Sequence, residues 1–180
     1  MHYLQEPGGR EEVRELTLRN SAWWWVVGAL VLDQVSKVIV VNTMTLHSPV
    51  SLVGDIIRLT YIRNAGAAFG LTLGGPVLHT VVAIGALGVL GWLFFRLPPA
   101  ARLQRTALAM VLGGALGNII DRIRLDYVID FFDVGVSEAW RWPVFNVADS
   151  FVTVGVLVLA LSWSRQEAGD AEQGANTAAS

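Results

Sequence analysis

The sequence predicts an all-α membrane protein whose four transmembrane helices carry a small extracytoplasmic β-strand cradle between helices one and two. Hydrophobic residues make up 53% of the 180 residues and the mean hydropathy is +0.51, more than is usual for a soluble domain. Four apolar segments approach the length that crosses a bilayer. Between the first two, a short stretch alternates apolar and polar residues, which is typical of a strand with one apolar face.

The four predicted spans differ in length and polarity. Residues 21–41 form the first, which is too long, with an acid and a base inside it, to be a cleavable signal peptide. Residues 76–95 contain no formally charged side chain. Residues 106–120 would form a helix of only about 22 Å, against a hydrocarbon core of about 30 Å. Residues 144–163 are long enough to span the bilayer despite two polar side chains near their start.

The domain organisation follows from these spans. We predict a cytoplasmic N-terminal extension at residues 1–20, a four-span membrane domain at 21–164 and a disordered cytoplasmic tail at 165–180. A slight excess of arginines beside the two ends of the chain and in the loop between the second and third spans, seven against five, favours cytoplasmic termini. Two polar loops then lie outside. In the first, residues 57–62 form the predicted strand, which either pairs with an extended peptide or is a plain connector.

Composition argues against several kinds of chemistry. The net charge is −2 and the arginines are scattered, so no basic face is predicted for nucleic acid. The chain has no cysteine, which excludes disulfides and thiolate nucleophiles, and its 3 histidines lack the spacing of a metal site. We therefore expect no nucleic-acid partner, no zinc site and no cysteine catalysis.

Two aspartates have mainly apolar neighbours at the edges of the membrane. Asp130 lies in the apolar stretch 127–132, and Asp149 lies near the start of the fourth span. A charge near hydrocarbon is costly unless it is paired, wetted or neutralised, so such an acid indicates function. Two acids that met there would share one proton, so that one could activate water while the other protonates a peptide carbonyl. The alternative is that both carboxylates are simply hydrated by water among the lipid headgroups and have no catalytic role.

Two amide–carboxylate pairs repeat one spacing. Asn118 and Asp121 close the third span, and Asn146 and Asp149 open the fourth. Residues three apart share one face of a helix, so each pair is expected to point into one pocket between the spans.

Two ion pairs are expected to be structural. Asp121 is followed by Arg122, its expected partner, and for this reason we do not predict that Asp121 is catalytic. Asp33 and Lys37 lie four residues apart in the first span, acid before base, and are expected to fix that helix against its neighbours.

Five sequence blocks occur in a fixed order between residues 33 and 149. They are Asp33, Gln34 and Lys37; residues 64–70; Gly117, Asn118, Asp121 and Arg122; Val128, Asp130 and Phe131; and Phe145, Asn146, Ala148 and Asp149. Together they resemble the bacterial lipoprotein signal peptidase family, the type II signal peptidases.

The resemblance implies an aspartyl endopeptidase of the bacterial inner membrane. Its substrates would be diacylglyceryl-modified prolipoproteins, cut just before the lipidated cysteine. It also implies contact with bilayer lipid, inhibition by globomycin-type compounds and no metal or organic cofactor, and we expect a monomer. By the same resemblance, Asp130 and Asp149 would be the catalytic dyad, Asn64, Asn118, Arg122 and Asn146 would line the substrate site, and Asp33, Lys37, Gly66 and Asp121 would support the structure.

Two other functions are open from the residues alone. Acids inside a membrane also form proton relays in transporters, although four short spans without inverted repeats leave little room for alternating access. A lipid transferase could instead bind magnesium through Asp121, Asp126, Asp130 and Asp133, because that ion prefers oxygen ligands. Insensitivity to chelators would argue against the transferase.

Overall fold

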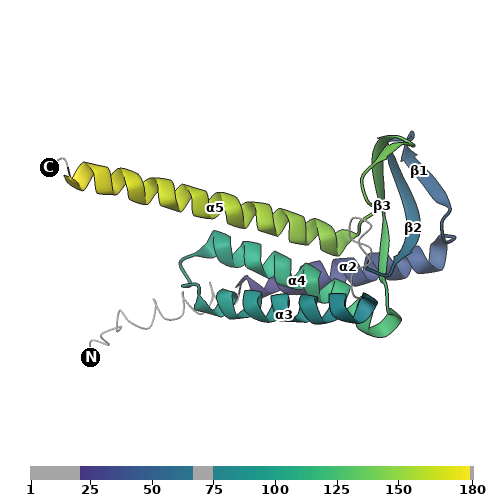
Figure 1. Cartoon of the computed structure of the whole chain (residues 1–180), viewed down its shortest axis with the longest axis horizontal. Helices are drawn as coiled ribbons and strands as arrows, with labels where there is room; N and C mark the ends of the chain where they lie inside the picture. Colours follow the sequence, from purple (N-terminus) through teal and green to yellow (C-terminus); the bar gives the residue numbers. More distant parts are fainter. Residues whose placement is uncertain (1–20, 67–74, 179–180) are drawn as a thin grey trace, which may run out of the picture.

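The computed structural model describes residues 21–66 and 75–178, where long helices lie side by side and a sheet lies at one end of them (Figure 1). The predicted N-terminal extension at residues 1–20 lies outside the described residues. So does the part of the second sequence block from residue 67 to residue 70.

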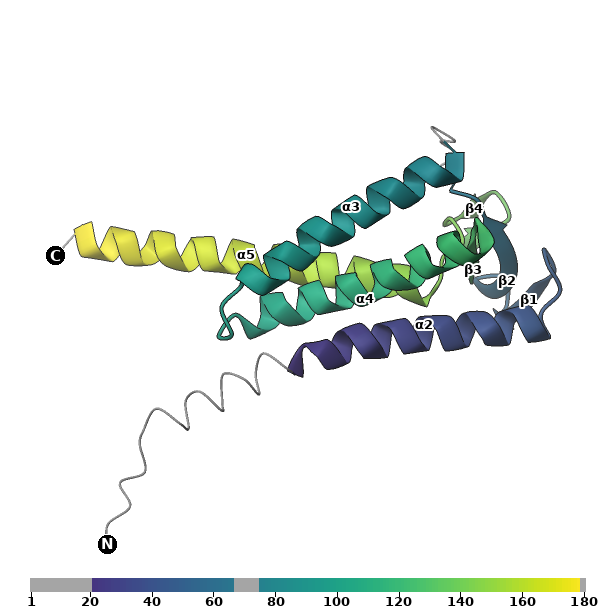
Figure 2. The same cartoon turned by 90° about the horizontal axis from the view of Figure 1, so that it is seen from below.

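Four helices in the described part of the chain are long and apolar enough to cross a membrane, which confirms the predicted spans. They are α2 (Trp23–Thr43), α3 (Gly75–Arg96), α4 (Arg102–Leu125) and α5 (Val147–Ala178). Helices α2 and α4 run toward the sheet, whereas α3 and α5 run away from it (Figures 1 and 2). Both long loops therefore lie at the same end of the molecule.

Helix α4 is longer than the predicted third span. It has 24 residues and a length of about 36 Å, because the charged residues at its ends continue the helix. Arg105 donates to the carbonyl oxygens of Phe94 and Leu97, at 3.1 and 3.0 Å. At the other end, Asp121 forms an ion pair with Lys37 of α2. These charges have partners inside the protein and so do not end the span.

Helix α5 also extends beyond the predicted fourth span. It has 32 residues and ends at Ala178, so it covers most of the tail for which the sequence predicted disorder. The prediction rested on the polarity of this tail. Its alanine, glutamate and glutamine residues have favourable helix propensities, which agrees with the continued helix.

The sheet has four antiparallel strands in the order β1-β2-β3-β4 and draws on both loops. Strands β1 (Pro49–Val53) and β2 (Ile57–Asn64) follow α2, and strands β3 (Val128–Ser137) and β4 (Trp140–Arg141) follow α4. The predicted strand is confirmed within β2. The cradle does not lie between helices one and two alone, since β3 is the partner of β2.

Helix α4 is central, because α2, α3 and α5 all pack against it (Figure 2). Glycines allow two of these approaches. A methyl group on Gly114 would lie 2.5 Å from the carbonyl oxygen of Ala148 in α5, and one on Gly117 would collide with the carboxylate of Asp33 in α2. The start of α5 and the middle of α2 are thus brought against the last turns of α4.

An apolar cluster fixes the sheet on the helix ends. It contains Val40 of α2, Tyr61 of β2 and Ile129 and Phe131 of β3, all of which are buried. The polar residues of the site lie beside this cluster.

Candidate active site

Asp130 reaches the helices from the middle of the sheet. It lies in β3 opposite Ile62 of β2, and only 1% of its surface is exposed. Directly after it, the backbone N–H groups of Phe131 and Phe132 both donate to the carbonyl oxygen of Phe145, at 3.0 and 2.7 Å. This bridge holds the residues just before α5 against β3, and it places the start of α5 next to Asp130.

Asp149 is held by the N-terminal cap of α5. The backbone N–H of Asp149 donates to Oδ1 of Asn146 at 2.9 Å, and the backbone N–H of Asn146 donates to Oδ2 of Asp149 at 3.2 Å. These reciprocal bonds form a capping box, in which the residue before the helix and its third residue satisfy each other. Asn146 is therefore a cap residue and not, as the spacing suggested, part of the helix face.

The side chain of Asn146 links the two acids. Its Nδ2 donates to Oδ1 of Asp130 at 2.6 Å and to Oδ1 of Asn118 at 3.0 Å. Asn118 in turn donates to Oδ1 of Asp149 at 2.8 Å. Strand β3, helix α4 and the start of α5 thus each bring one or more polar side chains to a single cluster, and both predicted amide–carboxylate pairs contribute to it.

Asn64 completes the surroundings of Asp130. Its Nδ2 donates to Oδ2 of Asp130 at 2.9 Å, while its Oδ1 accepts from the backbone N–H of Gly66 at 3.0 Å. Gly66 has a φ of 105°, and a methyl group on it would lie 2.7 Å from the His79 ring. A glycine is therefore needed for the turn that orients Asn64.

The charge state of Asp130 differs from that of an ordinary aspartate. Burial raises the pKa of Asp130 from 3.8 to about 7. The hydrogen bond from Asn64 opposes this rise, the nearby carboxylate of Asp149 adds to it, and Asn146 and Lys37 oppose it. The apolar neighbours seen in the sequence predicted this direction, and the carboxyl can hold a proton near neutral pH.

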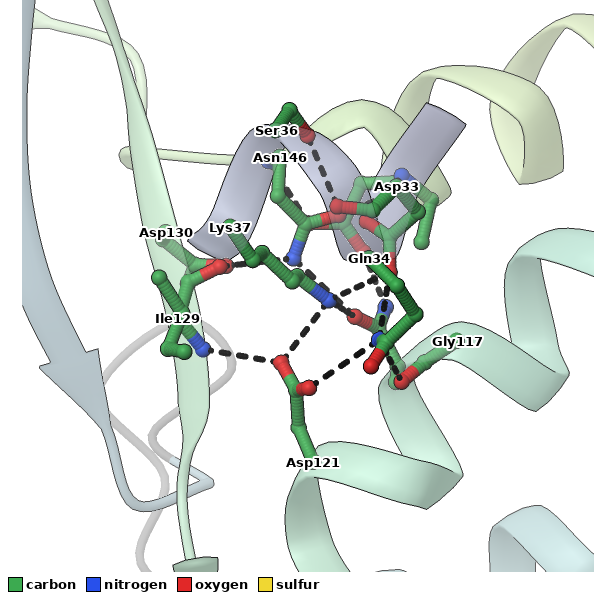
Figure 3. Close-up of polar contacts among 12 residues, drawn as sticks. Asp33, Gln34, Ser36, Lys37, Gly117, Asp121, Ile129, Asp130 and Asn146 are labelled. Carbon is green, nitrogen blue, oxygen red and sulfur yellow. Dashed lines mark hydrogen bonds and ion pairs between the residues drawn. The ribbon is translucent and has the colours of Figure 1, made fainter. Parts of the chain in front are cut away.

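A buried charge network supports the cluster from the side of α2 (Figure 3). Lys37 is 2% exposed, and its Nζ contacts Oδ2 of Asp33 and Oδ2 of Asp121, both at 2.8 Å, and Oδ1 of Asn118 at 3.0 Å. Gln34 bridges the same two carboxylates at 3.1 and 3.2 Å. The predicted ion pair of Asp33 with Lys37 is confirmed.

Each carboxylate of this network also holds the backbone beside one of the two acids. Asp121 Oδ2 accepts from the N–H of Ile129, the residue before Asp130, at 3.2 Å (Figure 3). Asp33 Oδ1 accepts from the N–H of Ala148, the residue before Asp149, at 2.9 Å. Since Lys37 joins the two carboxylates, one ammonium group fixes the relative position of β3 and α5.

The predicted partner of Asp121 was wrong. Asp121 pairs with Lys37, whereas Arg122 donates to the carbonyl oxygen of Asn118 at 3.3 Å. Neighbouring residues of a helix point in different directions, so adjacency in sequence did not indicate contact. Arg122 is half-buried, and the carboxylates of Asp149, Asp130 and Asp121 all lie near enough to attract its charge.

An open cavity gives access to Asp149. It has a volume of about 330 Å³ and a mostly apolar lining of Trp142, Phe145, Asp149, Ser150, Thr153 and Val154. Of these residues, the sequence predicted a role in the site for Asp149 alone. The spacing of residues 149, 150, 153 and 154 on one helix face was a signal that could have identified the α5 wall.

The aspartates proposed as magnesium ligands do not converge. Asp121 pairs with Lys37, and Asp133 pairs with Arg141 at 2.5 Å and with Arg58 at 3.5 Å. Among the described residues, no three His, Cys, Asp or Glu side chains are grouped so that they could hold a metal ion.

The chain is similar to known proteins over most of its length. The family model described as signal peptidase (SPase) II matches residues 25–165, from the first turn of α2 into α5, and so includes all the described strands. A lipoprotein signal peptidase from Geobacter sulfurreducens is 43% identical over 145 residues, or 79% of this chain and 90% of that protein. One from Symbiobacterium thermophilum is 44% identical over 138 residues, or 74% and 87%. A solved bacterial membrane enzyme has a TM-score of 0.75 and 28% identity, covering 83% of this chain and 91% of that one.

Proposed function

The chain belongs to the signal peptidase II family, and on this basis we propose that Asp130 and Asp149 are the catalytic dyad of an aspartic endopeptidase. The observation that carries the proposal is that Asn146 donates hydrogen bonds to the carboxyls of both Asp130 and Asp149. In addition, the pKa of Asp130 is raised to about 7. Aspartic proteases work with two neighbouring carboxyls of which one is protonated and the other ionised, and here Asn146 binds both carboxyls.

The surroundings of the two acids support different roles for them. Asp130 is almost fully buried and its pKa is about 7, so it is the acid that protonates the carbonyl oxygen of the scissile peptide. Asp149 is half-buried and lines the open cavity, where a water molecule can reach it. Asp149 is then the base that removes a proton from the attacking water.

Four polar residues are proposed to hold the substrate and the dyad. Asn64, Asn118 and Asn146 each donate to a dyad carboxyl, so they fix the direction of the oxygen atoms. The electrostatic attraction of Arg122 to Asp149 and Asp130 supports a place for it beside the dyad, where a guanidinium can bind a substrate carbonyl.

The proposed substrates are prolipoproteins that carry a diacylglyceryl group on the cysteine after the cleavage site. The mostly apolar cavity beside Asp149 opens along the bilayer-spanning helix α5, which suits a lipid-modified substrate. We further propose that the protein lies in the inner membrane, with both termini in the cytoplasm and the sheet on the outer side. It would be a monomer surrounded by bilayer lipid. Globomycin-type compounds would inhibit it.

A cleavage assay with two matched substrates tests this function. The purified protein should cut a diacylglyceryl-modified prolipoprotein just before the modified cysteine, as mapped by mass spectrometry, and globomycin should stop the reaction. The same prolipoprotein without the lipid should remain intact. Cleavage of neither substrate, or equal cleavage of both, would contradict the proposed substrate class.

A further inference from the structure

A second cavity lies beneath the sheet on the side of α2. It has a volume of about 180 Å³ and lies between the last turns of α2 and α4, strand β2 and the start of β3. It shares no lining residue with the cavity beside Asp149. The proposed cleavage takes place beside Asp149 and not in this cavity, although Lys37 and Asp121, which line it, belong to the network that holds the two acids.

The cavity carries uncompensated positive charge. Arg63 and Arg124 both line it, and among the described residues neither forms an ion pair. Asp121 is the carboxylate in the lining, and it is already paired with Lys37. Two arginines thus line a cavity in which, among the described residues, every carboxylate already has a cationic partner.

Arg63 is held in place without neutralisation of its charge. Its guanidinium lies 5.9 Å from the ring centre of Tyr61 and 5.1 Å from that of Tyr127. Its Nε donates to the hydroxyl of Tyr61 at 3.2 Å. This contact occupies one of the five N–H donors, so the group remains oriented and can bind an anion in a bidentate manner.

The outer wall of the cavity is apolar and exposed. Val38 and Val41 of α2 line it and are 59% and 44% exposed, on a helix that spans the membrane. Leu125, which ends α4, continues the apolar lining. Figure 2 shows that these helix ends lie at the level of the sheet, at the end of the spans where lipid headgroups are expected.

We propose that this cavity binds the phosphate of an anionic phospholipid from the leaflet next to the sheet. The two guanidinium groups take the phosphate, and the acyl chains lie along the exposed valines of α2. An anionic lipid is favoured over a zwitterionic one, because in the described part of the chain the lining has no unpaired carboxylate that could bind a headgroup ammonium. This proposal does not rest on the proposed cleavage reaction, because neither Arg63 nor Arg124 is assigned a role in it.

Native mass spectrometry of the detergent-solubilised full-length protein tests the proposal. Wild type is titrated with phosphatidylglycerol, with phosphatidylcholine and with phosphatidylglycerol in the presence of inorganic phosphate. Arg63→Gln and Arg124→Gln should each weaken phosphatidylglycerol binding about fivefold, and the double variant roughly thirtyfold, as expected for the loss of one charge each near a membrane surface. The two single variants suffice if the double variant does not fold.

Arg96→Gln is the matched control. Arg96 also stacks on an aromatic ring near the end of a span, with its guanidinium 5.1 Å from Trp92, but it lies at the end of α3 away from the sheet. The affinity of the Arg96→Gln variant for phosphatidylglycerol should stay within about twofold of that of wild type. Equal loss in Arg96→Gln, unchanged binding in the cavity variants, equal affinity for phosphatidylcholine, or displacement by millimolar inorganic phosphate would each overturn the proposal.

Discussion

Replacement of Lys37 by methionine should strongly destabilise the protein. Lys37 is the only lysine in the chain and is almost completely buried, with its Nζ 2.8 Å from each of two carboxylates. Methionine fills much of the same volume and removes the charge. Asp33 and Asp121, which are 0% and 2% exposed, would then remain buried without a cation.

The expected loss can be estimated from these contacts. At 2.8 Å and an effective dielectric constant of about 20, each ion pair has a gross Coulomb energy of about 6 kcal/mol. The cost of removing three charges from water offsets most of this, and breaking a buried pair typically costs about 3–5 kcal/mol. We therefore expect Lys37→Met to lower the free energy of unfolding by about 3–5 kcal/mol.

Unfolding in detergent micelles, followed by tryptophan fluorescence, measures this loss. The double variant Lys37→Met/Asp121→Asn removes one of the stranded charges and should recover part of the stability. Glu138→Gln is the control, since Glu138 is 76% exposed and its ion pair with Arg58 should contribute little. A Lys37→Met protein as stable as Glu138→Gln, or a double variant no better than the single one, would refute the reasoning.

Asn64→Ala should lower kcat/KM about tenfold or more, as expected for one lost hydrogen bond to a reacting carboxyl, while unfolding changes by only about 1 kcal/mol. A loss of stability as large as the loss of activity would make Asn64 a structural residue instead. Cleavage should fall about tenfold per pH unit above a pH of about 7, where Asp130 loses its proton, and a rate that rises to a flat plateau at high pH would contradict the shared-proton mechanism. The same pKa affects stability. The carboxyl of Asp130 has a pKa of 3.8 in the unfolded chain and about 7 in the folded protein, so between these two pH values the folded state binds more protons. The contribution of Asp130 to the free energy of unfolding therefore falls as the pH rises from about 4 to about 7. Unfolding at pH 5 and pH 8 should show a smaller difference for Asp130→Asn than for wild type.

The four spans and the ion pair within the first of them could be predicted, because each depends on residues close together in the sequence. Apolar length identified the four helices, and a spacing of four identified the pair of Asp33 with Lys37. Strand β3 could not be recognised, because its first residues form an apolar run without clear alternation around Asp130. Its pairing with β2, residues distant in sequence, is set by tertiary packing.

The geometry of the site depends on long-range contacts that no spacing shows. Asp121 meets Lys37 because α2 and α4 pack closely at Gly117, and sequence adjacency instead suggested Arg122. The pair of Asn146 and Asp149 has the spacing of a helix face and also that of a capping box. Which of these applied depended on where α5 begins, and helix boundaries are the least certain part of a prediction from sequence.

The central claim is that Asp130 and Asp149 together carry out the cleavage. Single-turnover cleavage of a diacylglyceryl-modified prolipoprotein at neutral pH tests it most directly, with wild type, Asp130→Asn and Asp149→Asn compared at equal amounts of folded protein. Asp126→Asn is the matched control, because Asp126 is exposed at the end of α4 with a φ of 65°, a conformation that asparagine also tolerates. Each dyad variant should be slower by at least about 100-fold, as expected for the loss of a general acid or base, while the control keeps the wild-type rate. Near-normal cleavage by either dyad variant would contradict the proposed mechanism.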